Sequence, residues 1–357
     1  MGYPEQKGLT LHTVKTSSCG ELKVYSEGNL EHAQKEEICA FLTVHDMGSN
    51  YESMVEFTHQ PCMEGMRQRA VFLHVVVPGQ EEGAQDLNPE FHFPSMQELG
   101  ETLVDVLDQL NLKYVLGLGE GAGANIITRF GMKHPTRCLG IVLIHPTSTT
   151  AGVMEHFKDK IIAWKLTTVG HNPTAEEYLV FHKFGQGVEA AKDKVKAMEE
   201  FRETLHTQIN PSDSVNEKKL SNDVTSLTFG LQTWDLNLST HLEQELKCDT
   251  LLVVGSKSSF LHTTETMYSH SNPTKTSILR IDDVGDVLDE APEKVSQSIL
   301  LFSQGLGLFT SLGLGGNRSR SGSMIPHDRR PSKSMEQYDQ PNVKRFVHDL
   351  VPGENQQ

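Results

Sequence analysis

The stretch Val115–Phe130, VLGLGEGAGANIITRF, decides how this chain folds. It begins as an apolar run, passes through four glycines in seven residues, and continues as a helix-forming segment. A tight turn between a buried strand and a helix is where many enzymes place a nucleophilic serine, in the pattern G-x-S-x-G. This turn has the glycines but lacks the serine, so its role has to be decided from the rest of the chain.

Two registers of the glycine pattern are possible. Gly119–Gly123 places Gly121 at the nucleophile position, and Gly117–Gly121 places Gly119 there. We prefer the first register, because the strand runs directly into Gly119 and the following helix then has an appropriate length. Neither register supplies Ser, Cys or Asp, so the turn keeps its conformational freedom without a nucleophile.

Strand-like and helix-like segments alternate on both sides of this turn. Near-continuous apolar runs separated by amphipathic helices are typical of a parallel sheet covered on both faces. The predicted strands are Ile38–His45, Ala70–Gly79, Tyr114–Gly119, Leu139–Pro146, Thr250–Gly255 and Ser277–Ile281, and the predicted helices include Glu98–Leu110, Ala122–His134 and Pro292–Ser303. Two shorter runs, Leu9–Thr16 and Glu21–Ser26, predict a hairpin at one edge of the sheet.

The chain divides into five predicted regions. The alternation stops after the strand that ends at Pro146 and resumes at Thr250, which indicates an inserted helical cap. Gly, Ser, Arg and Pro dominate from Leu306 onward, which is typical of disorder. The predicted boundaries are 1–36 for the edge hairpin, 37–146 for the first part of the core, 147–240 for the cap, 241–305 for the second part of the core and 306–357 for a disordered tail.

The order of segments predicts an α/β fold of the α/β-hydrolase type, with a mostly parallel, doubly wound sheet. In that fold the catalytic acid follows a later strand, but here the loop after Gly255 has no carboxylate before Glu265, and Ser258 occupies the acid position. The base position holds Gly285 or Asp286, and no histidine lies nearby in the chain. Three vacated positions argue against a Ser–His–acid triad.

Several long strings resemble the N-myc downstream-regulated (NDRG) family. They are FLTVHDMGSNY (Phe41–Tyr51), VVVPGQEEGA (Val75–Ala84), GLGEGAGANIITRF (Gly117–Phe130), GIVLIHP (Gly140–Pro146) and KCDTLLVVG (Lys247–Gly255). The resemblance extends over essentially the whole chain, including an Arg/Ser-rich tail. It implies an α/β-hydrolase fold without a triad, in a non-enzymatic, mainly cytoplasmic protein of signalling, stress response, differentiation or trafficking.

Three polar residues remain as pocket candidates. His45 and Asp46 follow the first buried strand, where hydrolases place oxyanion-hole backbone, so they could contact a ligand or retain acid–base chemistry. We favour a structural interpretation, in which the pair hydrogen-bonds loop backbone at the strand end. Glu120 either lines the former substrate cleft or is solvated on the turn.

No cofactor or metal site is expected. Gly119-x-Gly121-x-x-Ala124 fits a dinucleotide-binding fingerprint, but the next strand ends in His145 instead of an acidic residue, and Glu120 would repel a pyrophosphate. None of the 17 histidines has HExxH spacing or belongs to a His/Cys cluster.

Composition limits the partners. The formal net charge of −15 argues against nucleic acid or an anionic membrane surface. The longest apolar runs, such as Val71–Val77, are too short to span a bilayer, so no integral membrane segment is expected. The first residues lack the apolar core of a signal peptide, and the five scattered cysteines indicate reduced thiols. These features predict a cytoplasmic protein.

The tail contains two candidate phosphorylation sites. Arg318–Ser323 fits R-x-R-x-x-S, a pattern read by basophilic Ser/Thr kinases, and Arg329–Ser332 is a second basic–serine motif. Ser323 and Ser332 are therefore the expected phosphosites. The predicted function is a pseudoenzyme that binds proteins as a scaffold in cytosolic signalling. The alternatives are a hydrolase that uses His45, Asp46 and Glu120, or a small-molecule sensor.

Overall fold

The computed structural model describes most of the chain outside the cap and the tail. The described residues are 8–46, 49–78, 80, 93–148, 180, 198–199, 202, 238 and 242–312. The predicted cap therefore lies almost entirely outside the described residues. The tail beyond Leu312, with Ser323 and Ser332, lies outside them as well.

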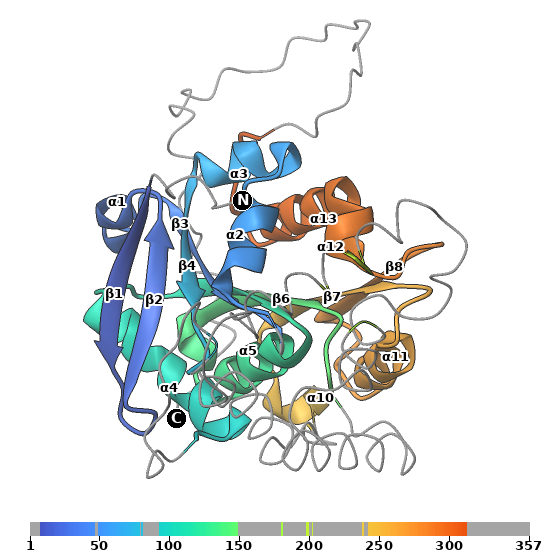
Figure 1. Cartoon of the computed structure of the whole chain (residues 1–357), viewed down its shortest axis with the longest axis horizontal. Helices are drawn as coiled ribbons and strands as arrows, with labels where there is room; N and C mark the ends of the chain where they lie inside the picture. The colour runs from blue at the N-terminus through green and yellow to red at the C-terminus, as the bar shows by residue number, and fades with distance from the viewer. Residues whose placement is uncertain are drawn as a thin grey trace, which may run out of the picture.

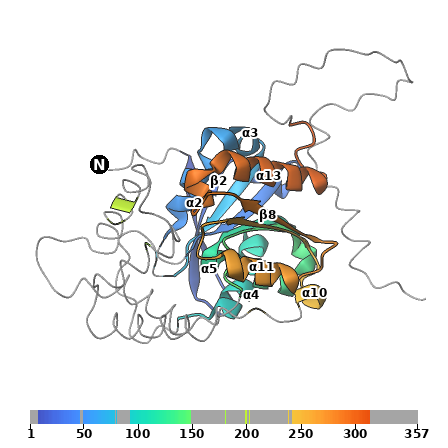
Figure 2. The same ribbon diagram turned by 90° about the vertical axis from the view of Figure 1, so that its right-hand side faces the viewer.

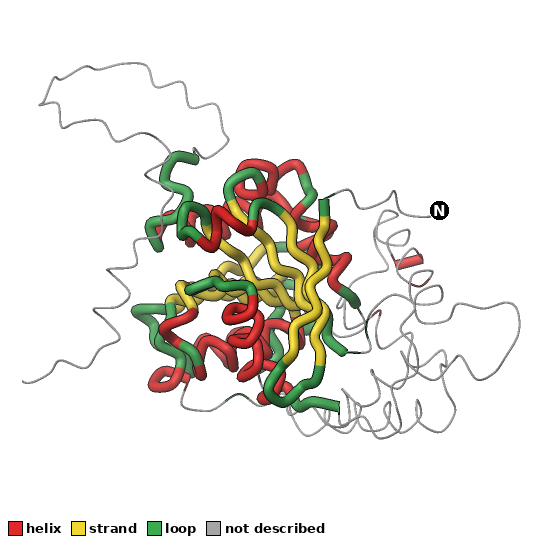
Figure 3. Tube along the Cα trace, turned by 90° about the vertical axis from the view of Figure 1, so that its left-hand side faces the viewer, coloured by secondary structure: helices red, strands yellow, loops and turns green. Residues whose placement is uncertain are grey.

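One eight-stranded sheet forms the centre of the molecule (Figures 1 and 3). Its strands are β1 (Leu9–Lys15), β2 (Glu21–Glu27), β3 (Cys39–Val44), β4 (Ala70–Val75), β5 (Val115–Glu120), β6 (Cys138–Ile144), β7 (Asp249–Gly255) and β8 (Thr276–Ile281). The spatial order is β1-β2-β4-β3-β5-β6-β7-β8. Only the β1–β2 and β2–β4 pairs are antiparallel. The predicted mostly parallel sheet and edge hairpin are confirmed.

Helices cover both faces of the sheet, as Figure 2 shows. One face packs against α1 (Leu30–Gln34), α4 (Met96–Gln109), α5 (Gly121–Lys133), α10 (Leu242–Glu245) and α11 (Leu261–Ser269). The other packs against α2 (Tyr51–Thr58), α3 (Glu64–Arg67), α12 (Val287–Glu290) and α13 (Pro292–Gly305). Successive residues of β3 alternate between the layers: Phe41 belongs to the second core and Leu42 to the first. No helix among the described residues is both long enough and apolar enough to cross a membrane.

The start of α4 shows how local sequence sets an element boundary. The helix begins at Met96, two residues before the predicted start at Glu98. Ser95 is the N-cap: its Oγ accepts from the Glu98 N–H at 3.2 Å, and the Glu98 carboxylate accepts from the Ser95 N–H at 2.8 Å. This capping box satisfies two backbone donors and fixes the first turn. Apolar periodicity alone missed the cap, because the cap consists of polar residues.

The predicted tail boundary at Leu306 is wrong. Leu306, Leu308 and Phe309 are buried in the core beside α13, and Phe309 is only 1% exposed. The Phe309 ring stacks on Phe41 of β3, with centroids 6.1 Å apart. The folded body therefore continues to Leu312, where the described residues end. The boundary was placed too early because the Gly-rich composition of this segment gave no sign of these buried apolar side chains.

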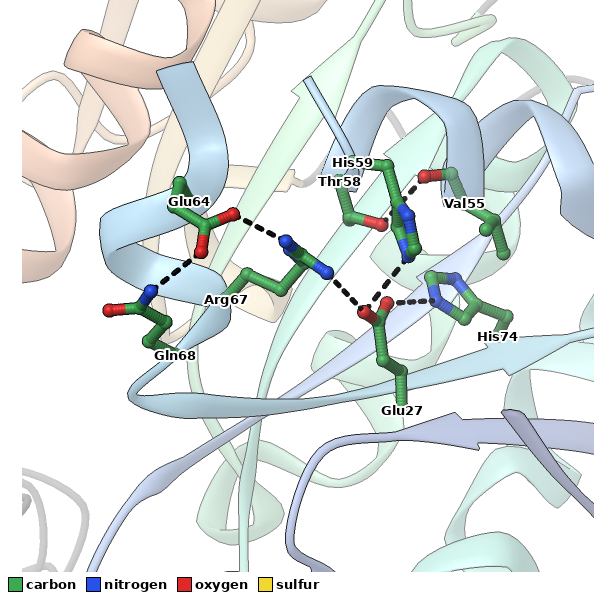
Figure 4. Close-up of polar contacts among 8 residues, drawn as sticks. All are labelled: Glu27, Val55, Thr58, His59, Glu64, Arg67, Gln68 and His74. Carbon is green, nitrogen blue, oxygen red and sulfur yellow. Dashed lines mark hydrogen bonds and ion pairs between the residues drawn. The ribbon is translucent and has the colours of Figure 1, made fainter. Parts of the chain in front are cut away.

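A partly buried polar cluster links the edge hairpin to the rest of the fold (Figure 4). Glu27, at the end of β2, accepts from Arg67 Nη1 at 3.2 Å and contacts His59 Nε2 at 2.9 Å. Its other oxygen lies 4.0 Å from Nε2 of His74, whose Nδ1 bonds the Thr43 hydroxyl at 2.8 Å. Burial lowers the pKa of His74. Burial alone would raise the pKa of Glu27, but His74, His59 and Arg67 outweigh it and leave that pKa below its usual value. The cluster thus contains an ionised Glu27 and a neutral His74 at neutral pH.

Candidate functional site

The turn between β5 and α5 has the backbone of a nucleophile elbow without its side chain. Gly121 is the first residue of α5 and has φ +53°, in the left-handed region that favours glycine. A Cβ placed on Gly121 would lie 1.9 Å from Oδ1 of Asp46. Since that contact is far inside van der Waals distance, a serine cannot occupy this position unless Asp46 moves.

Asp46 lies where a side chain on Gly121 would point. It follows β3, and its Oδ1 accepts a hydrogen bond from the Ala122 N–H at 2.7 Å. In enzymes with this turn, the N–H of the residue after the nucleophile helps to hold the oxyanion. Here that N–H donates to the carboxylate of Asp46, whose negative charge is also stabilised by the positive end of the α5 dipole. The structure therefore places the Asp46 carboxylate at the nucleophile position predicted from the sequence, hydrogen-bonded to the Ala122 N–H.

Glycine at position 123 makes this contact possible. A Cβ on Gly123 would lie 2.2 Å from the Val44 carbonyl oxygen and 2.4 Å from that of His45. Only a residue without a side chain lets the first turn of α5 approach the end of β3 so closely. The close approach brings Asp46 to the helix N-terminus.

His45 hydrogen-bonds loop backbone through both of its ring nitrogens. It is 1% exposed, its Nε2 accepts from the Val77 N–H at 3.2 Å, and its Nδ1 donates to the Asp46 carbonyl at 2.8 Å. The ring proton is therefore assigned to Nδ1. Both nitrogens fix the loops after β3 and β4, so the ring orders the backbone around Asp46.

The predicted acid position holds a turn residue. Ser258 follows β7, and its Oγ accepts from the Phe260 N–H at 3.2 Å. The nearby hydroxyls of Thr147 and Ser148 donate to the backbone carbonyls of Gly121 and Thr263, respectively. Both of these hydroxyl groups therefore hydrogen-bond backbone carbonyl groups in the structure.

At the predicted base position, the loop after β8 places the carboxylate of Asp286 at the site. A Cβ on Gly255, the last residue of β7, would lie 2.3 Å from the Val284 carbonyl oxygen, so this glycine lets the following loop fold against the strand end. Of the two residues predicted for this position, Gly285 donates its N–H to Glu290. Asp286 is 2% exposed and caps α12 by accepting from the Leu288 N–H at 3.0 Å.

Glu120, His145 and Asp286 form a cluster that sequence spacing did not reveal. One ligand atom from each lies within 4.8 Å of the others, so this group could hold a metal ion although no metal site was expected. Glu120 is 9% exposed, so little of this residue is accessible to solvent. His145 follows β6 directly, and its ring stacks on Phe260 with centroids 5.6 Å apart. The missed signal was a histidine at the carboxyl end of a buried strand, which is also the position of His45.

Comparisons with known proteins agree on one family and one fold. The family model described as "Ndr family" matches residues 12–310. The chain is 38% identical to the uncharacterized protein ZK1073.1 of Caenorhabditis elegans, over 97% of this chain and 98% of that protein. It is 33% identical to protein NDRG1 of Xenopus tropicalis, over 79% of this chain and 69% of that protein.

The solved structures that resemble this chain are α/β-hydrolases, which confirms the predicted fold class. A thermophilic esterase from Thermogutta terrifontis matches with a TM-score of 0.62 at 17% identity, over 83% of this chain and 98% of that one. MGS-M2, an α/β-hydrolase from a deep-sea metagenome library, matches with a TM-score of 0.63 at 15% identity, over 80% of this chain and 94% of that one. At these identities the likeness concerns the fold alone.

Proposed function

Because the chain belongs to the Ndr family, we propose that it is a non-enzymatic member that acts as a protein-binding scaffold in cytosolic signal transduction. The observation that carries the proposal is the contact between Asp46 and the turn at Gly121. A hydrolase on this fold needs a nucleophile on the turn and a vacant oxyanion donor. In this chain Gly121 stands in place of the nucleophile, and the Ala122 N–H, which would be the oxyanion donor, donates to the Asp46 carboxylate.

The predicted acid and base positions support the same conclusion. Ser258 accepts a hydrogen bond from the Phe260 N–H in the loop after β7, and Asp286 accepts one from the Leu288 N–H of α12. Side chains that hydrogen-bond loop backbone hold the loops in place, which suits a rigid binding surface. A catalytic triad needs side chains that hydrogen-bond one another in the order nucleophile, base and acid.

We further propose that phosphorylation of the tail regulates binding. The tail beyond Leu312 contains seven Lys/Arg and five Asp/Glu, a net charge of +2, which leaves −17 for the rest of the chain. Each phosphate adds about −1.5 to −2 charges. Phosphates on Ser323 and Ser332 would therefore reverse the sign of the tail and weaken its attraction to the acidic body.

The proposal predicts that the interacting proteins depend on the state of Ser323. The test is affinity capture read by mass spectrometry, using the full chain treated with a basophilic kinase, the untreated chain, Ser323→Ala, and a chain ending at Leu312. Ser334→Ala is the matched control, because this serine lies outside both basic motifs. We expect a set of partners bound by the folded body, part of which changes on phosphorylation of the wild type and of Ser334→Ala only.

Two results would contradict the proposal. Identical partner sets for the phosphorylated chain and Ser323→Ala would remove Ser323 as a regulator. Failure of every form to retain partners above a bait-free control would remove the scaffold role.

A further inference from the structure

We propose that Glu120, His145 and Asp286 bind one divalent transition-metal ion, of which Zn²⁺ is the best match, at the carboxyl edge of the sheet. The three side chains come from separate elements that meet at this edge. Glu120 ends β5, His145 follows β6, and Asp286 is the N-cap of α12. Ligand atoms of all three lie within 4.8 Å of one another.

The donor set suits a borderline transition metal. Carboxylate oxygens and an imidazole nitrogen bind Zn²⁺ at about 2.0–2.2 Å, which places tetrahedral donors roughly 3.3–3.6 Å apart. The observed separations, up to 4.8 Å, need a contraction of about 1–1.5 Å, which small side-chain rotations achieve. Mg²⁺ and Ca²⁺ prefer sites made of oxygen alone, so the imidazole selects against both.

Charge favours a cation at this point. Glu120 and Asp286 are 9% and 2% exposed, and both belong to the same 4.8 Å group. Two carboxylates this close repel each other when both are ionised, and burial strengthens the repulsion. A bound dication converts that repulsion into attraction on both sides. The burial of the pair is a second observation, separate from the distances, that favours an ion here.

The ligands are already oriented. Stacking on Phe260, with an interplanar angle of 10°, fixes the plane of the His145 ring. Asp286 is held by its capping bonds from the N–H groups of Leu288 and Asp289 to Oδ1, which orient its carboxylate. Gly255 permits the close approach of the loop that carries Asp286. Such supporting contacts lower the ordering cost of binding an ion.

The bound ion would tie the ends of β5, β6 and α12 together at the mouth of the former catalytic site. Ligands that bind only the folded state stabilise it, so the ion is expected to raise the melting temperature. This role involves no bond-breaking step. It is independent of the proposed scaffold function, which rests on Asp46 and Gly121.

The test measures Zn²⁺ binding by isothermal titration calorimetry and thermal melting, using the purified, metal-stripped full chain. The variants are Glu120→Gln, His145→Asn and Asp286→Asn. Asparagine at 286 keeps an oxygen to cap α12, and asparagine at 145 tolerates the positive φ of +46° found there. The matched control is Asp283→Asn, which changes a carboxylate in the same loop that is 88% exposed and pairs with Lys257.

We expect one Zn²⁺ per chain in the wild type and in Asp283→Asn, with a dose-dependent rise in melting temperature. Each of the three ligand variants should lose at least tenfold in affinity, and X-ray absorption should show one imidazole among nitrogen and oxygen donors. The apo melting curve of each variant is recorded first, and Asp286→Asn alone suffices if another variant fails to fold. The proposal is overturned if Zn²⁺ does not bind, if folded ligand variants bind it like the control, or if Ca²⁺ binds as tightly.

Discussion

Gly121→Ser is expected to destabilise the protein by about 2–6 kcal/mol in chemical denaturation. The left-handed backbone costs a residue with a Cβ about 1–3 kcal/mol, and forced overpacking adds about 1–3 kcal/mol. Both effects apply here, since Gly121 has φ +53° and its Cβ would lie 1.9 Å from Asp46 Oδ1. Restoring the serine of the elbow should therefore weaken the fold.

Gly20→Ser separates the two effects. Gly20 has φ +70°, but no atom lies within 4 Å of its Cβ position. This control should lose only the cost of left-handed backbone, about 1–3 kcal/mol, without the overpacking contribution. The double variant Asp46→Gly/Gly121→Ser removes the carboxylate from the contact and should recover part of the stability lost by Gly121→Ser. If Gly121→Ser is no less stable than Gly20→Ser, Asp46 does not fill the nucleophile position.

Ending the chain at Gly305 is expected to destabilise the body by more than about 3–5 kcal/mol, the usual cost of one buried Phe→Ala change. The truncation removes the buried side chains of Leu306, Leu308 and Phe309. It also removes the carbonyls of Phe309 and Leu312, which accept from Gln304 Nε2 at 3.1 and 2.7 Å. Ending the chain at Leu312 keeps all of these contacts and should change the free energy of unfolding by less than about 0.5 kcal/mol.

Urea denaturation of both truncated chains and of Phe309→Ala tests this boundary. Phe309→Ala in the full chain should lose about 3–5 kcal/mol, because it removes the ring that stacks on Phe41. Leu301→Ala is the matched control, since that side chain lies on α13 but is 48% exposed. Equal stability of the chains ending at Gly305 and Leu312 would restore the boundary predicted from composition.

Much of the fold could be predicted from the sequence, because buried parallel strands and amphipathic helices have strong local patterns. The strand centres, the edge hairpin and the apolar face of α4 were predicted correctly, and the errors were mostly of one or two residues at the ends. The predicted start of α4 was two residues late, because the capping residue Ser95 is polar and gives no signal in the apolar periodicity. Leu308 and Phe309 were missed because two apolar side chains in a Gly-rich segment give no periodic signal.

The candidate site could be predicted only in part. The sequence located the glycine-rich turn between β5 and α5, because that turn is a local feature. The contact of Asp46 with the Ala122 N–H joins two strand ends far apart in the chain, so no spacing rule revealed it. His145 and Asp286 meet for the same reason, through the register of β5, β6 and β7 and the close approach at Gly255. Sheet topology, unlike strand position, has no local pattern in the sequence.

The most direct test of the central claim is ester hydrolysis by the purified full chain. The assay uses a panel of p-nitrophenyl esters and lactones, with a fluorophosphonate probe to detect contaminating serine hydrolases. With Asp46 at the turn, we predict turnover equal to that of buffer and no labelling of the chain. Turnover above buffer in an unlabelled sample, lost in a folded His45→Ala or Glu120→Gln variant, would show that the site retains chemistry and would contradict the account.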